Sequence, residues 1–398
     1  MTAPLVRPAA PLTHLGPRAL AVALRPEQHP AVVLVDALLR APREQMERSG
    51  HHVLTVDAVA LDGAAVLDRV RACDPQPESA IVGIGGGTIM DAAKLTRVAL
   101  DDPHAHRAGL DRAERLGTAL LPDTVSVRRR LILQPSTLGT GSEFSPVACH
   151  SIDGSRRLLS GQALRAHTVA LDPGLTHGLG AAAVAEGIIE MLLRLLGSAV
   201  SSDDAVIPDR ASEELLTRIA TLAAAERRHP GDPATRAGLL LASGEMHTGW
   251  AGVGRAPYGV THWYLANELA AVTGARKVPA TLHLLPGIWS RILAGDQRLG
   301  HAHRMHRFWA HVAGPLGLPD DPVQGVRYGA AMAGIRSLSP RPEEVRLAAA
   351  QCRALGGGRH PAFRGFSAAE LRELLDPSSS PPAPRRGSPP TTKGGDTP

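Results

Sequence analysis

The chain has 398 residues, of which 43% are hydrophobic and 20% are charged. This length and composition exclude global disorder and favour two domains over one. The formal net charge of +5 is small and the arginines are scattered, so the sequence does not indicate nucleic-acid binding, which needs basic residues gathered on one face.

Cysteine content and hydropathy indicate the cellular compartment. Cys73, Cys149 and Cys352 are far apart and odd in number, so they predict neither a disulfide framework nor a zinc site, as is usual in a reducing cytoplasm. No apolar run reaches the ~18 residues of a membrane span, and the first residues lack the pattern of a signal peptide. We therefore expect a cytoplasmic protein without a membrane partner.

The first third of the chain predicts alternating strands and helices. Apolar, β-branched runs over residues 31–36, 52–56, 80–84 and 131–135 predict strands, and helical stretches lie at 64–73 and 91–100. Strands that are apolar throughout are typical of a parallel sheet covered on both faces. We expect a doubly wound, α/β dinucleotide-binding domain over residues 1–173.

The composition and periodicity of the sequence change after Asp172 and Pro173. The following residues are rich in Ala and Leu with helical periodicity, as over 208–226, where Leu215, Leu216 and Ile219 recur at helical spacing. This pattern predicts an all-α domain over 174–376, which would hold the substrate or metal site. Residues 377–398 are mostly Pro, Ser, Gly and Thr, which predicts a disordered tail.

A glycine-rich turn, Gly83-Ile84-Gly85-Gly86-Gly87-Thr88-Ile89-Met90-Asp91-Ala92-Ala93-Lys94, follows the third predicted strand and opens a helix. Consecutive glycines let the backbone approach a ligand, and the positive end of the helix suits a diphosphate. The alternative is an ordinary strand-to-helix loop, in which Thr88 would cap the helix and Asp91 would complete a capping box.

A second loop, Pro135-Ser136-Thr137-Leu138-Gly139-Thr140-Gly141-Ser142-Glu143, leaves the next predicted strand and is dense in hydroxyls and glycines. Two such loops at the ends of successive strands are typical of a dinucleotide crevice. The pair resembles the GGGSxxDxAK and PTTxGTGSE signatures of the iron-containing (group III) alcohol dehydrogenases, within the dehydroquinate synthase-like superfamily.

The resemblance covers most of the chain. Residues 169–176 resemble the family's ILDPxLT segment, Leu284-Leu285-Pro286 resembles the LLP that starts a long helix, and residues 358–361 resemble its last turn. It implies an α/β domain followed by an all-α domain, and the interconversion of an alcohol and a carbonyl. The GTGSE form favours the dehydrogenase branch over dehydroquinate synthase.

The resemblance also implies cofactor contacts. Asp36, which ends the first predicted strand, would accept hydrogen bonds from the adenine ribose, and its charge favours NAD over NADP. The other implied contacts are Gly86, Gly87, Thr88 and Asp91 at the diphosphate, Ser136, Thr137, Thr140 and Ser142 towards the nicotinamide, and Arg157 in place of a phosphate-contacting lysine. The alternative role of the hydroxyls is local turn bonding.

In this family a divalent iron or zinc ion polarises the substrate oxygen. An ungapped alignment from Asp172 places Glu190 and Arg194 at the first two ligand positions. Residues 261–267 resemble the family's HxxxH stretch, in which His262 matches a ligand, and counting back from Leu284 places Lys277 at the last ligand position. Arginine has no lone pair for a metal, and two cations where a dication should lie disfavour metal binding. Glu186 and His283 are the candidate substitute ligands.

Two interpretations of these replacements remain open. In the first, fixed cations replace the metal: Lys277 polarises a carbonyl or, like His262, handles the proton, and Arg194 binds a substrate carboxylate. In the second, the chain is an inactive relative in which Glu190 and Arg194 form a salt bridge.

The function that we expect is an NAD-dependent oxidoreductase, which acts as a homodimer or larger assembly. Its substrate would be a hydroxy acid, or the C-terminal hydroxy residue of a peptide, oxidised with decarboxylation in bacterial natural-product biosynthesis. The alternatives are a non-catalytic nucleotide- or peptide-binding partner of another enzyme, and a lyase or cyclase similar to dehydroquinate synthase.

Overall fold

The fold is described from a computed structural model, which covers residues 9–152, 155–256, 258–336 and 338–376. The expected tail at 377–398 lies outside these residues. The strands are Leu12–Leu15 (β1), Val32–Asp36 (β2), His52–Val56 (β3), Ile81–Gly85 (β4), Thr118–Leu120 (β5), Leu131–Pro135 (β6), Val147–Ile152 (β7), Ser155–Ser160 (β8) and Thr168–Leu171 (β9).

The main sheet is parallel and has the strand order β1-β9-β6-β4-β2-β3. The four strands predicted from apolar runs are β2, β3, β4 and β6, so those predictions are confirmed. The helices of this part of the chain are Ala19–Leu24 (α1), Arg40–Arg48 (α2), Gly63–Ala72 (α3), Gly87–Asp101 (α4) and Pro103–Leu116 (α5).

Helices cover the sheet on both faces, which explains its continuous apolar strands. Val33 on β2 belongs to a core that includes Leu20 of α1 and Met46 of α2. Leu34, the next residue, belongs instead to the core with Val66 of α3 and residues of α4. Because successive side chains of a strand point to opposite faces, both must be apolar. The predicted doubly wound arrangement is confirmed.

A small second sheet, in the order β5-β8-β7, was not predicted from the sequence. β7 and β8 form an antiparallel hairpin, and β5 pairs with β8 in parallel. The two strands of the hairpin carry His, Cys, Ser and Arg among their apolar residues, so they lack the continuous apolar run that identified the other strands.

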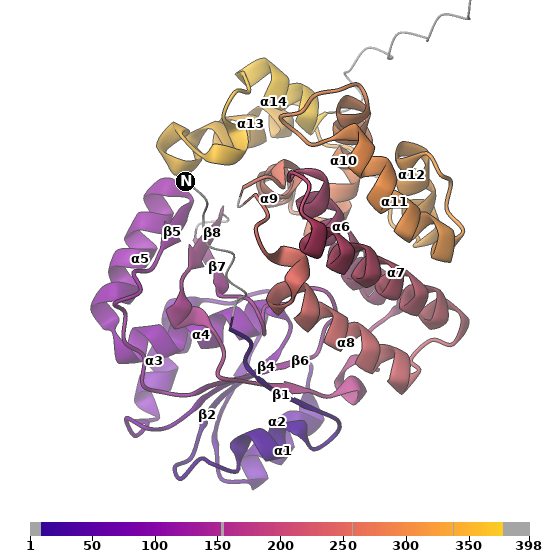
Figure 1. Cartoon of the computed structure of the whole chain (residues 1–398). Coiled ribbons are helices and arrows are strands. Elements are labelled where there is room, and N and C mark those ends of the chain that lie inside the picture. Colours follow the sequence, from indigo (N-terminus) through magenta and orange to yellow (C-terminus); the bar gives the residue numbers. More distant parts are fainter. Residues whose placement is uncertain (1–8, 153–154, 257, 337, 377–398) are drawn as a thin grey trace, which may run out of the picture.

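From residue 177 onward, every regular element in the described part of the chain is a helix, so the predicted all-α region is confirmed (Figure 1). The α-helices are Ala181–Val200 (α6), Val206–Arg228 (α7), Pro233–Thr248 (α8), Thr261–Thr273 (α9), Lys277–Leu293 (α10), Ala302–Leu316 (α11), Pro322–Met332 (α12), Pro342–Gly358 (α13) and Ala368–Leu375 (α14). The expected boundary after residue 173 stays a prediction.

One prediction about this region is wrong. Leu284-Leu285-Pro286 was expected to start a long helix, but it lies inside α10, which begins at Lys277. Proline removes one backbone donor from a helix. The helix nevertheless continues through Pro286, because Leu284, Leu285 and Ile288 are all buried in the core and tertiary packing outweighs local propensity.

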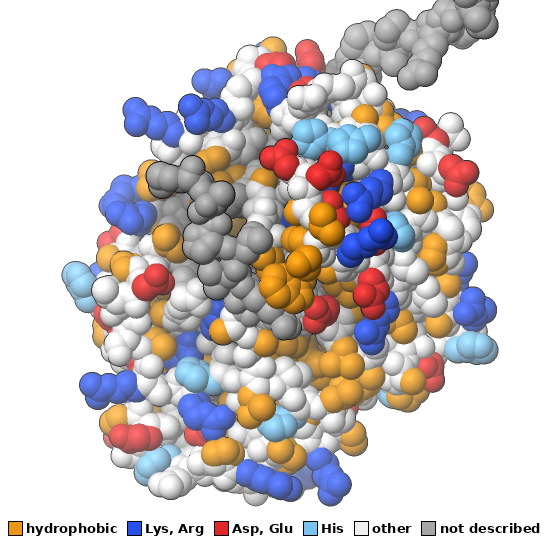
Figure 2. Space-filling model, viewed as in Figure 1, with side chains coloured by type: hydrophobic (Ala, Val, Ile, Leu, Met, Phe, Trp, Pro, Cys, Tyr) orange, Lys and Arg blue, Asp and Glu red, His pale blue; other side chains and the backbone are white. Residues whose placement is uncertain are grey.

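The surface agrees with the charge pattern of the sequence. On the face shown in Figure 2, Lys and Arg side chains are scattered and interspersed with acidic ones, without a continuous basic stripe. Among the described residues, none of the helices combines the length and apolar character needed to cross a membrane.

Candidate active site

The two predicted cofactor loops meet at the point where the winding of the sheet reverses. From β2 the chain continues outward to β3, and from the adjacent β4 it continues to β6 on the other side. Ligands of doubly wound sheets bind at this switch point. Asp36 ends β2 and Gly85 ends β4, so close that a Cβ on Gly85 would lie 3.2 Å from that of Asp36. The structure therefore brings the predicted ribose carboxylate beside the glycine-rich turn.

The glycine-rich turn leaves the start of α4 open. Gly86 occupies the N-cap position, and α4 begins at Gly87 without a side-chain cap from the described residues. The alternative that Thr88 caps this helix is therefore wrong, since Thr88 is already its second residue and is exposed. The first N–H groups of a helix need partners, and its positive end attracts anions. This turn can hold a diphosphate.

The hydroxyl-rich loop lies against the same turn. A Cβ on Gly86 would lie 3.4 Å from Thr137 Cγ2, and one on Gly87 would lie 3.4 Å from Thr140 Cγ2. The hydroxyl oxygens of Thr137 and Thr140 are buried and have no hydrogen-bond partner among the described residues. Buried hydroxyls are normally paired. These two orphaned groups, beside a glycine cradle, fit a polar ligand such as a dinucleotide.

Asp91 and Ser142, two predicted cofactor contacts, are bonded to each other. Ser142 Oγ donates to Asp91 Oδ1 at 2.5 Å and accepts from Lys94 Nζ at 2.8 Å, while Lys94 also donates to the carbonyl of Val147 at 2.6 Å. Lys94 is fully buried. The network joins α4 to the hydroxyl-rich loop, so these side chains position the loop. Ser136 lies at the start of the same loop, where its backbone N–H donates to Gly85.

The hydroxyl-rich loop also packs directly on the helical region. A Cβ on Gly139 would lie 2.0 Å from the carbonyl oxygen of Gly187 on α6, and one on Gly141 would lie 1.9 Å from His247 Nε2 on α8. Both loop glycines have positive φ angles, +86° and +61°, which other residues rarely adopt. Only glycine allows the loop to lie this close to both helices.

Two of the four candidate catalytic residues lie over one tryptophan ring, and a third is paired with one of them. Glu190 and Arg194 lie one turn apart on α6 and form a salt bridge of 3.5 Å. The guanidinium of Arg194 lies 4.6 Å from the centre of the Trp263 ring, and Lys277 Nζ lies 3.5 Å from it. Two cations on one aromatic ring are held by its electron-rich face. Trp263 follows His262 in the first turn of α9, and no pattern in the sequence predicted this role.

The fourth residue, His262, lies in a buried part of the same cluster. Its Nε2 has no hydrogen-bond partner among the described residues, and its ring lies against α6, where a Cβ on Gly197 would be 2.7 Å from Cε1. Burial, with a smaller contribution from Lys277, lowers the pKa of His262 to about 3. The imidazole is therefore neutral near pH 7, and its unpaired Nε2 is left to form a hydrogen bond with a ligand.

The surroundings of Lys277 lower the pKa of its ammonium group, so that this side chain changes its charge near neutral pH. Burial lowers the pKa of Lys277 to about 7, with Arg194 acting in the same direction and the carboxylate of Glu190 opposing both. Desolvation penalises the ammonium form, and a like charge adds to that cost. A lysine in this state can donate a proton to a developing alkoxide and later recover it.

The residues present do not fit a divalent metal ion. Within the described residues, no group of three or more His, Cys, Asp or Glu side chains is arranged to hold one. Glu186 is instead paired with Arg276 at 2.5 Å, and His283 Nε2 donates to the carbonyl of Leu375 at 3.2 Å. Arg194 and Lys277 lie beside Glu190, and the positive charge of these side chains disfavours a dication there.

Arg157 lies on β8 and faces the helical region. Its Nε is buried and has no hydrogen-bond partner among the described residues. Burial raises the pKa of Glu268 on α9 to about 7, and the charge of Arg157 opposes this rise. Arg157 thus contributes positive charge between the small sheet and α9. Its predicted contact with a cofactor phosphate stays a prediction.

Sequence comparison relates the first part of the chain to one enzyme family. Residues 20–173 match the model of the iron-containing alcohol dehydrogenases. The chain is 35% identical over 142 residues to phosphonoacetaldehyde reductase of Streptomyces viridochromogenes, which is 34% of this chain and 35% of that protein. It is 22% identical over 226 residues to the NADPH-dependent aldehyde reductase YqhD of Escherichia coli, with 56% and 57% covered. The chain thus spans about a third to somewhat over half of these curated relatives.

Structural comparison extends the similarity to nearly the whole chain. The NADH-dependent butanol dehydrogenase A of Thermotoga maritima superposes with a TM-score of 0.77 at 12% identity, covering 94% of this chain and 98% of that one. Maleylacetate reductase of Agrobacterium tumefaciens gives a TM-score of 0.65 at 18% identity, covering 94% and 97%. At these identities the superpositions establish the shared fold.

Proposed function

We propose that this chain, whose residues 20–173 match the iron-containing alcohol dehydrogenase model, is an NAD-dependent oxidoreductase that interconverts an alcohol and a carbonyl on a substrate carrying an acidic group. The observation that carries this proposal is the pair of cations, Arg194 and Lys277, on the ring of Trp263. A hydroxyl-rich loop with two orphaned threonine hydroxyls packs on the helix that bears Arg194.

The cofactor would lie in the crevice at the end of β2 and β4. Gly86, Gly87 and the open start of α4 would hold the diphosphate, and Thr137 and Thr140 would donate to the nicotinamide half. Asp36 supports NAD over NADP, because a carboxylate at the ribose repels a 2′-phosphate. When bound, the nicotinamide supplies or accepts the hydride.

The chain's own residues would act on the carbonyl and on the acidic group. Charged Lys277 would polarise the carbonyl oxygen and donate a proton to it, while His262, which is neutral, would form a hydrogen bond to the substrate. Arg194 would hold the acidic group, since guanidinium binds carboxylate in a bidentate manner. In this scheme two fixed cations supply the charge that metal-dependent enzymes obtain from an ion.

The names of the relatives support an acidic substrate. Phosphonoacetaldehyde and maleylacetate, the compounds named for two of the similar proteins, are both carbonyl compounds with anionic groups. More specifically, we propose a hydroxy acid or the C-terminal hydroxy residue of a peptide, in bacterial natural-product biosynthesis. Oxidation of a β-hydroxy acid would give a β-keto acid, in which the bond to the carboxylate breaks, CO2 leaves and the carbonyl receives the electron pair.

We also propose a homodimer or larger assembly in the cytoplasm. The outer strand β1 supports the proposed assembly, because it lies at the edge of the main sheet and its Leu12 and Leu15 are 59% and 49% exposed. Exposed edge strands are ready to pair or to be covered. The proposed cytoplasmic location rests on Cys73, Cys149 and Cys352, which are free thiols.

The test is NADH oxidation with matched aldehydes that differ only in an acidic group, for the native protein and Arg194→Ala. The variant should raise KM about tenfold to a hundredfold for the acidic substrates only, the size of a lost charge-assisted hydrogen bond. An equal loss on neutral aldehydes would overturn the carboxylate role. Binding of NADH without turnover of any substrate would favour the non-catalytic partner.

A further inference from the structure

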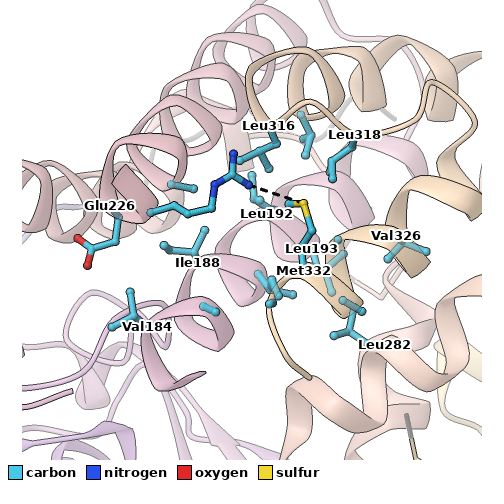
Figure 3. A pocket seen from close by; sticks show the side chains of 18 of the residues that line it. Val184, Ile188, Leu192, Leu193, Glu226, Leu282, Leu316, Leu318, Val326 and Met332 are labelled. Atoms are coloured by element: carbon cyan, nitrogen blue, oxygen red, sulfur yellow. Dashed lines mark hydrogen bonds between the residues drawn. The ribbon is translucent and has the colours of Figure 1, made fainter. Parts of the chain in front are cut away.

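A cavity of about 390 Å³ lies in the helical region, apart from the cofactor crevice. Its walls come mainly from α6, α7, α11 and α12 (Figure 3). On α6 it is lined by Val184, Ile188 and Leu192, whereas Glu190 and Arg194 do not line it. The cavity is therefore distinct from the candidate active site, although both use α6.

Small residues on α12 create this space. Gly325 and Gly329 lie one turn apart among the lining residues, with Ala330 beside them. A Cβ on Gly325 would lie 2.2 Å from the Trp309 ring, so only glycine lets that ring lie against the helix. A Cβ on Gly329 would instead meet Leu318 at 3.7 Å, an ordinary contact. Protein interiors are close-packed, and a space of this size is within the range of small-molecule sites, about 300–1,000 Å³.

The polar groups deep in the cavity are already satisfied. Arg236 donates to both carboxylate oxygens of Glu226, at 2.7 and 2.9 Å, and to the carbonyl of Thr176 at 3.0 Å. Glu226 also accepts from the backbone N–H of Gly231 at 3.0 Å. Both side chains are buried. This pair is neutral overall and offers no charge to a ligand. Apart from the cation described next, the remaining lining is mainly apolar.

One cation at the cavity has no carboxylate partner. Arg227 on α7 is exposed and lines the cavity, and the only hydrogen bond of its guanidinium within the described residues runs from Nη1 to Met332 Sδ at 3.7 Å (Figure 3). A thioether is a weak acceptor. The guanidinium therefore has donors to spare, and it lies where an apolar cavity opens to water.

We propose that this cavity binds an amphipathic anion, namely a medium-chain carboxylate whose chain lies along Ile188, Leu192 and Val326 and whose head meets Arg227. The apolar lining matches a hydrocarbon chain, and the unpaired guanidinium matches a carboxylate. The inference goes beyond the proposed oxidoreductase activity and does not depend on it, because none of its residues belongs to the active site.

The test is isothermal titration calorimetry of the full chain with butyrate, octanoate, decanoate and the uncharged decanol. Affinity should rise about fourfold per added methylene, the value expected for burying hydrocarbon, and decanoate should bind more tightly than decanol. Arg227→Gln should remove that preference, weakening decanoate about tenfold while leaving decanol unchanged. Arg228→Gln, the adjacent exposed cation that does not line the cavity, is the matched control and should change nothing.

Two further variants keep the proposal falsifiable. Gly329→Leu should fill the cavity and abolish binding of decanoate and decanol, with a thermal melt to show that it folds. Arg194→Ala should leave decanoate binding intact; a loss there would place the ligand in the active site and overturn the proposal. It is also overturned if Arg227→Gln and Gly329→Leu bind normally, if no saturable binding occurs, or if Gly329→Leu changes only the oligomeric state, which would make the cavity a contact between copies.

Discussion

Replacing Lys277 tests whether a side-chain cation acts on the substrate carbonyl. Lys277→Met keeps the apolar stem and removes the charge that lies 3.5 Å from the Trp263 ring. General-acid catalysis contributes about 10²–10⁴ in rate, which corresponds to about 3–5 kcal/mol of activation free energy. We therefore expect kcat for carbonyl reduction to fall by that factor, while the affinity for NADH, most of whose contacts would come from the glycine-rich turn, changes little.

The pH dependence of the reduction rate shows which protonation state of Lys277 acts in the reaction. Burial lowers the pKa of Lys277 to about 7, and only its protonated form can donate. Reduction should therefore be constant below pH 7 and fall about tenfold per pH unit above it. Lys277→Arg keeps a guanidinium that stays charged throughout this range and does not give up its proton, so its rate should be low at every pH and should not fall between pH 7 and 9.

The assay is steady-state NADH oxidation from pH 5.5 to 9.5, with NADH affinity from fluorescence titration as the control for folding. The reasoning is refuted if Lys277→Met retains more than a tenth of the native kcat, or if Lys277→Arg loses activity over the same pH range as the native enzyme. In either case the proton would come from elsewhere, and His262→Ala would be the next variant to measure.

Three further outcomes are expected. Asp36→Ser should shift the preference from NAD towards NADP by at least tenfold in kcat/KM, because it removes the charge that repels a 2′-phosphate; an unchanged ratio would remove Asp36 from cofactor choice. Gly141→Ala should lower the free energy of unfolding by about 1–3 kcal/mol, because the φ angle of Gly141 is +61° and a Cβ there would collide with His247. Adding His247→Ala to the same chain should recover part of the lost free energy of unfolding, as measured in denaturant melts. Elemental mass spectrometry should find well under one iron or zinc per chain after incubation with either ion, whereas a stoichiometric ion would contradict the donor set around Glu190.

The sequence by itself determined the doubly wound sheet and the place where the two glycine-containing loops meet. Runs such as residues 32–35 are apolar throughout, and only a strand covered on both faces needs that pattern. The glycine-rich turn and the hydroxyl-rich loop follow two such strands, and parallel strands end at one edge of a sheet. These are local patterns, so a single sequence carries them without knowledge of distant contacts.

Only the tertiary structure decided what the individual side chains do. Asp91 and Ser142 were predicted as cofactor contacts, which stays a prediction, and the structure adds that Lys94 bonds both of them into a support of the loop. Trp263 gave no signal, because its role depends on α6 and α10 bringing Arg194 and Lys277 to the same ring. Such contacts join elements far apart in the chain, and their geometry follows from how helices pack, which no local pattern encodes.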